Sequence, residues 1–198
     1  MTERRPTLRE RQRSETRRAI QAHAVRLFTD RGYDVVTVAD VAAAAGVSAM
    51  TVYRHFPTKE DLVLVEQPVL LIAERVAASA ATEPLVRRVG GALVEAAAAL
   101  TSGGEADERF LLDCLRLMVA TPALRARHLD SQYALQQAVV DALGVDAADA
   151  DAAFPARAAT SACLAALHTA LTRWAEDDGR TPLPELIERA LVASFGPA

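Results

Sequence analysis

The short stretch from Ser48 to Phe56, SAMTVYRHF, concentrates side chains that form hydrogen bonds. It offers a hydroxyl, a guanidinium, an imidazole and a phenol, carried by Thr51, Arg54, His55 and Tyr53. Groups of these kinds contact phosphate oxygens and base edges. Val52 and Phe56 are spaced i, i+4, which places both on one face of a helix and leaves the polar groups for the other faces. We therefore expect a helix that covers a core on one side and contacts something outside the chain on the other.

Two short helices are expected to present these side chains. Thr37 and Asp40, three residues later, form a capping box that predicts the start of a helix, which Gly46 ends after about two turns. Ser48 caps the next helix, and Pro57 stops it. This is the helix-turn-helix arrangement, in which the second helix enters the major groove. On its own the pattern is weak, because any small three-helix domain could show it.

The rest of the chain predicts helices rather than a sheet. Hydrophobic residues make up 51% of the 198 residues, and aromatic residues only 5%. The one short β-branched run, residues 34–38, is too brief for a sheet. A fourth helix is predicted to open at a capping box formed by Thr58 and Asp61, and Pro68 should kink or split it. We expect an all-α fold of about nine helices.

The charge is unevenly distributed. Residues 1–59 contain 11 Lys and Arg against 6 Asp and Glu, whereas the other 139 residues contain 11 against 20. A basic N-terminal third on an acidic chain suggests contact with a polyanion. A solvated charged tail is the alternative, and composition does not separate the two. Residues 1–13, which are rich in arginine, are predicted to be a flexible basic arm.

Several features indicate a cytoplasmic protein. The arginine-rich start lacks the apolar segment of a signal peptide. The most apolar run, residues 62–76, is broken by charged and polar residues, so no membrane span is expected. Cys114 and Cys163 lie inside apolar helical patterns without metal-ligand spacing, which favours buried, reduced thiols over a redox role.

Short motifs across roughly residues 14–62 resemble the TetR family of transcriptional regulators. In order, and correctly spaced, they are Leu27-Phe28, Gly32-Tyr33, Thr37-Val38, Val41-Ala42, Ala45-Gly-Val-Ser48, Thr51-Val-Tyr53, His55-Phe56 and Lys59-Glu60-Asp61-Leu62. The resemblance implies an N-terminal three-helix DNA-binding domain, a linking fourth helix and an all-α regulatory domain. In the family, that regulatory domain dimerises through its last two long helices and often binds a small ligand.

The resemblance also implies roles for single residues. Four become phosphate contacts: Thr37, Tyr53, His55 and Lys59. Three form the tip of the recognition helix: Ala49, Met50 and Thr51. Arg54 is able to read polar base edges, and Arg17 to reach phosphates or the minor groove, although a solvated arm is an equal alternative for a single arginine. Together with Ser48, these residues are the predicted DNA-binding set.

The tip of the predicted recognition helix departs from the family pattern. Family members often have glycine where this chain has Met50. The side chains of Ala49 and Met50 cannot form hydrogen bonds with a base edge. Their expected use is apolar contact, for example with thymine methyl groups.

The last two predicted helices, residues 152–176 and 182–195, carry wide apolar and small-residue faces. Such faces pair with a second copy in a four-helix bundle or pack within one chain, and the pattern favours neither. The family resemblance implies a homodimer through these helices. In the helix predicted at residues 83–100, the pair Gly90-Gly91 indicates either a close helix contact or a flexible spot.

Polar side chains on apolar helical stripes, with their neighbours, are candidates for a pocket in the C-terminal part. A buried polar group is costly unless it is paired, so each is either a satisfied core residue or a ligand contact. Together they would anchor a small hydrophobic effector in a largely apolar pocket. The candidates are Cys114, Arg116, Met118, His128, Gln132, Tyr133, Gln136, His168 and Trp174.

The sequence thus predicts a flexible basic arm at residues 1–13, a helix-turn-helix DNA-binding domain at 14–62 and a helical ligand-binding and dimerisation domain at 63–198. We expect a ligand-responsive repressor that binds a palindromic operator in double-stranded DNA as a homodimer. The alternative is a helical ligand-binding or scaffold protein without specific DNA binding. Because the sequence has no phosphate loop, nucleophile elbow or metal-ligand cluster, we expect no enzymatic activity, cofactor or metal.

Overall fold

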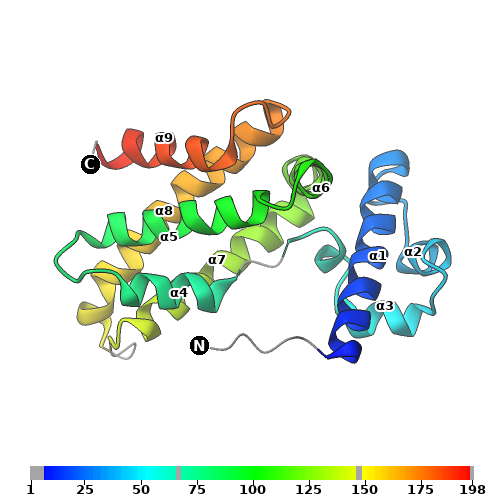
Figure 1. The fold of residues 1–198 in the computed structure, drawn as a ribbon, viewed down its shortest axis with the longest axis horizontal. Helices are drawn as coiled ribbons and strands as arrows, with labels where there is room; N and C mark the ends of the chain where they lie inside the picture. The colour runs from blue at the N-terminus through cyan, green and yellow to red at the C-terminus, as the bar shows by residue number, and fades with distance from the viewer. Residues whose placement is uncertain (1–6, 66–67, 146–148, 197–198) are drawn as a thin grey trace. The chain divides into compact units, whose positions relative to one another are not determined.

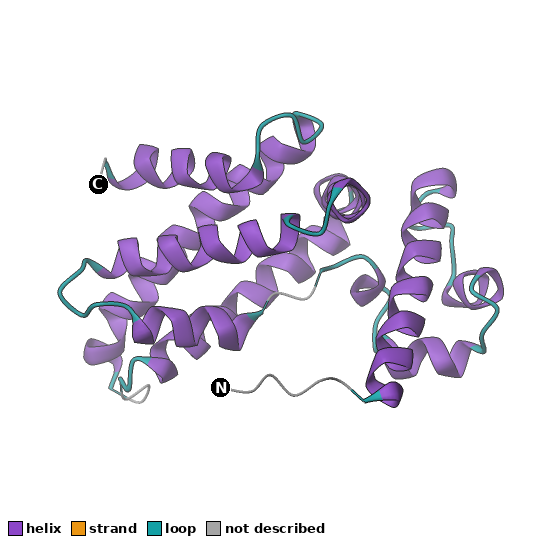
Figure 2. Ribbon diagram, in the orientation of Figure 1, coloured by secondary structure: helices purple, strands orange, loops and turns teal. Residues whose placement is uncertain are grey.

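The computed structural model describes residues 7–65, 68–145 and 149–196. Within them the chain forms only helices and connecting loops (Figure 2), as the sequence predicts. The chain divides into two compact units, Met1–Val65 and Glu66–Ala198. The boundary therefore lies three residues beyond residue 62, the predicted end of the DNA-binding domain. Each unit is described by itself.

Over residues 7–65, the N-terminal unit contains three α-helices and a 3₁₀ turn (Figure 1). They are α1 (Leu8–Arg31), α2 (Val38–Ala44), α3 (Ala49–His55) and η1 (Glu60–Leu62). α1 begins six residues before the predicted end of the flexible arm, so the prediction for residues 8–13 was wrong. Arg, Gln and Glu are strong helix formers, and this segment extends α1 without any core contact of its own. Residues 1–6 of the predicted arm lie outside the described residues.

Side-chain caps set the bounds of α2 and α3, as predicted. The Thr37 side chain accepts a hydrogen bond from the backbone N–H of Asp40 at 3.2 Å, and the Asp40 carboxylate accepts one from the backbone N–H of Thr37 at 2.8 Å. Ser48 caps α3. Gly46, between the two helices, has φ +67°, a left-handed conformation in which glycine carries no Cβ penalty.

The predicted fourth helix is not continuous. Thr58 and Asp61 form the predicted reciprocal cap, with N–H to side-chain distances of 3.0 and 3.3 Å, but only the short η1 turn follows it. α4 (Val69–Ala78) begins directly after Pro68. Proline has no backbone N–H and its ring clashes with the preceding turn, which explains why an α-helix starts here rather than passing through. The predicted start of the fourth helix at the Thr58 cap was therefore wrong, because its α-helix begins only after Pro68.

The C-terminal unit is a helical assembly built around α8 (Ala150–Glu176). This helix packs against α5 (Leu85–Thr101), α6 (Glu105–Ala120), α7 (Pro122–Ala142) and α9 (Leu183–Phe195), and α4 packs on α7 and α5. Its buried side chains include Leu164, Leu167 and Trp174. α5 and α9 lie side by side in Figure 1.

The predicted close helix contact occurs at Gly90. A Cβ added there would lie 2.9 Å from Leu191 Cδ1 of α9, closer than real Cβ atoms approach. A side chain at this position would make the flexible Leu191 side chain shift, so α5 and α9 approach closely here. Gly91 differs, because it is exposed and no atom lies within 4 Å of an added Cβ.

Candidate nucleic-acid interface

α3 presents two different faces. Val52 and Phe56 are only 0% and 1% exposed, as predicted for its core side. Met50 is 77% exposed, Tyr53 is 49% exposed, and Arg54 is exposed as well. The helix therefore offers a thioether, a phenol and a guanidinium to the outside while its other face is fixed in the core.

Hydroxyl groups of the predicted contact set also shape the motif. The Ser48 side chain accepts a hydrogen bond from the Thr51 backbone N–H at 3.1 Å, and the two hydroxyl oxygens are 2.9 Å apart. The Thr37 hydroxyl donates to Asp40 Oδ2 at 2.7 Å. A hydroxyl has a single proton, so Thr37 would have to turn its hydroxyl away from Asp40 to donate to a phosphate.

Arg17 connects α1 to the end of α3. Its guanidinium donates a hydrogen bond to the backbone carbonyl of His55 and lies 4.3 Å from the centroid of the buried Phe56 ring. The last carbonyls of a helix lack intrahelical partners and carry partial negative charge, so a guanidinium is a good partner for them. Arg17 therefore positions the recognition helix, a contact that the sequence analysis missed because the partners are 38 residues apart.

His55 lies in a basic environment. Burial lowers the pKa of the His55 imidazole, and the positive charges of Arg13, Arg54 and Arg17 lower it further. A neutral imidazole still has one N–H to donate. The predicted phosphate contact would therefore begin as a neutral hydrogen bond within a cluster of guanidinium groups.

Lys59 connects the start of η1 to the end of α1. Its ammonium group donates a hydrogen bond to the Tyr33 carbonyl at 2.6 Å. The Lys59 Nζ atom also lies 4.3 Å from the centroid of the Tyr33 ring and 5.6 Å from the centroid of the Phe28 ring. An ammonium group has three protons, so this contact leaves donors for a phosphate. Lys59 is the only lysine in the chain, and its ammonium group makes both the carbonyl and the ring contact.

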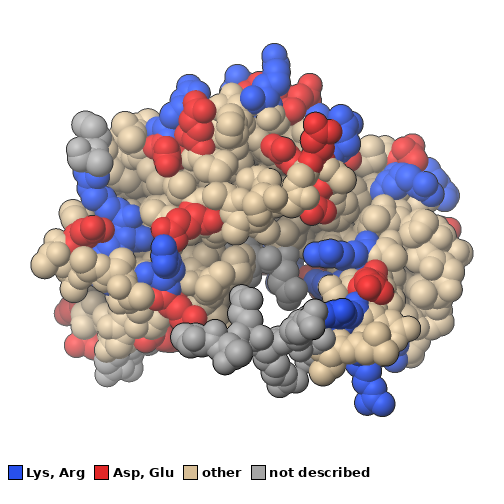
Figure 3. Space-filling model, in the orientation of Figure 1, with Lys and Arg blue, Asp and Glu red and all other residues tan. Residues whose placement is uncertain are grey.

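The surface charge differs between the two units. Figure 3 shows both basic and acidic side chains on each unit, but the balance differs, because residues 1–59 contain 11 Lys and Arg against 6 Asp and Glu and the other residues contain 11 against 20. Arg54 is exposed on α3 and Lys59 lies just beyond it, and together with the basic excess within residues 1–59 they favour a polyanion.

The predicted effector-pocket residues do not form one site. Three of them meet between α7 and α8: the His128 and His168 rings stack with centroids 5.5 Å apart, and Gln132 Nε2 lies 3.4 Å from His128 Nε2. We call these three residues the histidine cluster. Within the described residues, the Nδ1 atom of His168 is buried without a hydrogen-bond partner.

Three further candidates belong to the core. Cys114, Met118 and Trp174 are at most 2% exposed. Burial, assisted by the neighbouring Asp113 carboxylate, raises the pKa of the Cys114 thiol to about 12, so this thiol stays protonated at neutral pH. Both cysteines are free and buried, as expected.

The remaining candidates make other contacts. Arg116 forms ion pairs with Asp113 and Asp178. Gln136 donates a hydrogen bond to a backbone carbonyl of α8 at 3.0 Å. Tyr133 is 73% exposed, so the expectation that it lines a pocket in the C-terminal part is not met by a buried position.

The histidine cluster makes the stability of the protein sensitive to acid. Burial, and to a smaller extent His168, lowers the pKa of His128 from 6.5 to about 4. Between pH 6.5 and pH 4 the unfolded state therefore binds more protons than the folded state. The stability that comes from burying a neutral His128 is complete above pH 6.5 and is lost as the pH falls toward 4. We expect the free energy of unfolding to fall by about 2 kcal/mol between pH 7 and pH 5, measured by urea unfolding.

The matched variants are His128→Gln and His23→Gln, the second replacing a histidine of α1. The first should reduce the pH dependence to the part that comes from His168 and His55, whose pKa values burial also lowers, and the second should leave it in place. Equal pH dependence in wild type and His128→Gln would contradict the assignment.

No group of three or more His, Cys, Asp and Glu side chains is arranged to hold a metal ion in the described part of the chain. None of the helices in these ranges combines the length and the apolar composition that crossing a bilayer requires.

An all-helical chain with an outward-facing α3 in a helix-turn-helix unit defines a DNA-binding regulatory protein. Two family models agree with this class. The model of bacterial regulatory proteins of the tetR family matches residues 20–65, and the model of the MftR C-terminal domain matches residues 87–193. The second match alone spans more than half of the chain, and the chain belongs to the TetR family.

Named relatives show the same relationship over shorter segments. The HTH-type transcriptional regulator TcmR of Streptomyces glaucescens is 31% identical over 131 residues, which cover 63% of this chain and 57% of TcmR. An uncharacterised HTH-type transcriptional regulator of Mycobacterium tuberculosis is 51% identical over 43 residues, 22% of this chain and 21% of that protein. The chain therefore matches little more than half the length of the first relative and about a fifth of the second.

Solved structures share the fold. NalD of Pseudomonas aeruginosa, the secondary repressor of a multidrug efflux pump, superimposes with a TM-score of 0.56 at 24% identity, over 92% of this chain and 95% of NalD. SmeT, the repressor of a Stenotrophomonas maltophilia multidrug efflux pump, superimposes with a TM-score of 0.56 at 18% identity, over 90% of this chain and 88% of SmeT. At these identities the similarity supports the fold alone.

Proposed function

We propose that the protein is a transcriptional repressor that binds a palindromic operator as a homodimer and releases it when a small hydrophobic effector binds. The observation that carries this proposal is the exposed face of α3, which is held by a buried face and a side-chain cap. Repression is the direction we propose because NalD and SmeT, which have the same fold, are repressors.

The exposed residues of α3 suggest how the operator is read. Met50 and Ala49 stand at the exposed start of the helix, where they fit apolar contact with thymine methyl groups. Arg54 is exposed and is the side chain best able to donate to guanine. Tyr53, His55 and Lys59 would hold the phosphates and fix the register of the helix.

The exposed sides of α8 and α9 support dimerisation. Ala158, Ala165 and Thr169 are exposed and lie on one face of α8, where small side chains permit close helix packing. A hollow of about 720 Å³ between α8 and α9, lined by residues that include Arg173 and Ala190, is available to a partner. Much of the apolar stripe of α9 already packs within the chain, so only its remaining face serves a second copy.

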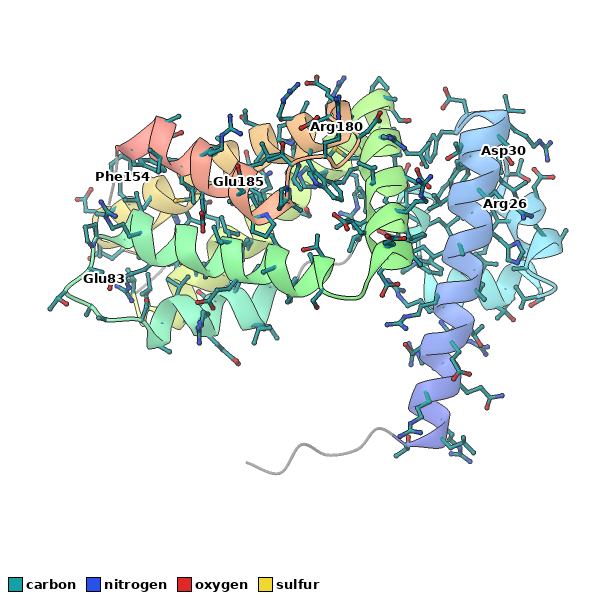
Figure 4. The ribbon with its side chains drawn as sticks, turned by 45° about the horizontal axis from the view of Figure 1, so that its top comes forward. Arg26, Asp30, Glu83, Phe154, Arg180 and Glu185 are labelled. Atoms are coloured by element: carbon teal, nitrogen blue, oxygen red, sulfur yellow. The ribbon has the colours of Figure 1, made fainter. Side chains whose placement is uncertain are left out.

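Replacing Lys59 by alanine is expected to weaken binding to all DNA sequences and to lower the slope of log K against log salt by about one. The reason is the loss of one phosphate contact with its released counterion. Filter binding at several salt concentrations measures the slope. Arg26→Ala, on the C-terminal half of α1 (Figure 4), removes the same charge elsewhere and should leave the slope unchanged. An unchanged slope in Lys59→Ala would overturn the phosphate assignment.

A gel-shift assay with the DNA upstream of the gene tests the proposed function. A specific, salt-sensitive band with two related half-sites supports an operator-binding dimer. The absence of any specific band favours the alternative, a helical ligand-binding or scaffold protein. Release of that band by a compound from a panel of hydrophobic effectors, accompanied by a thermal shift, tests the effector.

A further inference from the structure

The seam between α5 and α9 holds an apolar groove that the predicted effector pocket does not include. Its volume is about 750 Å³, within the range of roughly 300–1,000 Å³ that small-molecule sites occupy. Its apolar walls are formed by residues of both helices, including Val86, Val94, Leu191, Val192 and Phe195. None of the candidates proposed from the sequence lines this groove.

The two glycines of α5 create this groove. Gly90 allows α9 to approach through Leu191, which closes the floor. Gly91 lines the groove and is exposed, and a Cβ at this position would meet no atom within 4 Å. A side chain at Gly91 would fit the fold and would occupy space that is now open, so the missing side chain keeps the groove wide.

The charges around the groove are not balanced. Glu95 forms an ion pair with Arg75, with N and O atoms 2.6 Å apart, and Arg87 also has a partner. Glu188 lines the groove, and no hydrogen bond or ion pair of its carboxylate is found within the described residues. Residues 66–198 contain 11 Arg and no Lys against 18 Asp and Glu, so this part of the chain is acidic as a whole. Both the local and the wider charge favour a positively charged occupant.

We propose that the α5/α9 groove binds a lipophilic organic monocation, with its apolar body between the two helices and its charge near Glu188. This inference rests on the proposed function, because the occupant would be the effector of the regulator. Figure 4 shows α5 and α9 side by side, with Glu185 on α9 and Glu83 at the turn before α5.

The position of the groove supplies a route to regulation. Glu188 and Val192 line both this groove and the α8/α9 hollow on the other side of α9. A ligand that moves α9 therefore alters the surface proposed for the second copy. For the ligand to release the operator, it needs only to bind one of two dimer arrangements more tightly than the other.

Tetraphenylphosphonium and tetraphenylborate form a matched pair of probes, because they have nearly the same size and shape and opposite charge. Isothermal titration calorimetry of the full chain should detect the cation and at least about tenfold weaker binding of the anion. Gly91→Leu should weaken cation binding at least about tenfold by filling the groove, while leucine also has the higher helix propensity. Glu188→Gln should weaken it up to about fivefold, as for an exposed charge pair. Ala98→Leu, an exposed change on α5 outside the groove, should leave binding unchanged.

Each outcome decides the proposal. Equal or tighter binding of the anion, or full cation binding by Gly91→Leu with an unchanged melting curve, would overturn it. A changed mass of Gly91→Leu in light scattering would show that a second copy occupies the groove, and would overturn it too. Gel shifts on the same samples separate the two proposals, because operator binding without cation binding refutes only the effector site.

Discussion

Replacing Ala165 by arginine is expected to convert the proposed dimer to a monomer and to lower operator affinity by at least about a hundredfold. Ala165 is exposed on the small-residue face of α8, so the fold of one chain tolerates the larger side chain. In a two-fold symmetric interface each substitution occurs twice, which places two unpaired guanidinium groups between closely packed helices. Light scattering measures the mass, and a gel shift measures the affinity.

Ala98→Arg is the matched control, since it places the same side chain at an exposed position of α5 that lines none of the hollows described above. It should remain dimeric and bind the operator normally. A dimeric Ala165→Arg variant with intact operator binding would rule out this face of α8 as the interface.

Replacing Arg17 by alanine is expected to lower the free energy of unfolding by about 2 kcal/mol, through loss of a charged hydrogen bond and a cation–π contact. Operator affinity should fall by more than about tenfold, because α3 loses the guanidinium that fixes its end. Arg17→Lys keeps the charge but not the planar group over Phe56, and should recover less than half of either loss. Chemical unfolding and gel shifts measure the two effects.

The salt dependence of binding distinguishes a positioning residue from a DNA contact at this position. If Arg17 acts only through α3, the slope of log K against log salt stays that of the wild type. A slope lowered by about one, as at Lys59, would place Arg17 on a phosphate. Arg18→Ala, which removes an exposed neighbouring charge, controls for unspecific loss of basicity.

Local signals in the sequence predicted much of the N-terminal unit. The caps at Thr37 and Ser48, the turn at Gly46 and the inward pair Val52 and Phe56 each depend on residues close in sequence, and the structure confirms them. The roles of Arg17 and Lys59 in holding the unit together depend on partners 38 and 26 residues away, which no local pattern reveals.

The effector site was harder to predict for a physical reason. Polar residues on apolar stripes marked the histidine cluster, but such residues are satisfied or buried by neighbours whose positions only the fold determines. The α5/α9 groove is defined mainly by what is absent at Gly91. A sequence shows that a side chain is missing, but not whether the space is filled by a neighbour, as at Gly90, or left open.

The exposed start of α3 has a consequence for how the sequence that the helix reads can change. Met50 is 77% exposed and Ala49 is exposed beside it, so mutation at these two positions disturbs no packing. Val52 of the same helix and Phe56 directly after it are buried, so mutation at either position would disturb the core. Substitutions at this tip can therefore change which sequence the helix reads without disturbing the packing that holds the helix in place.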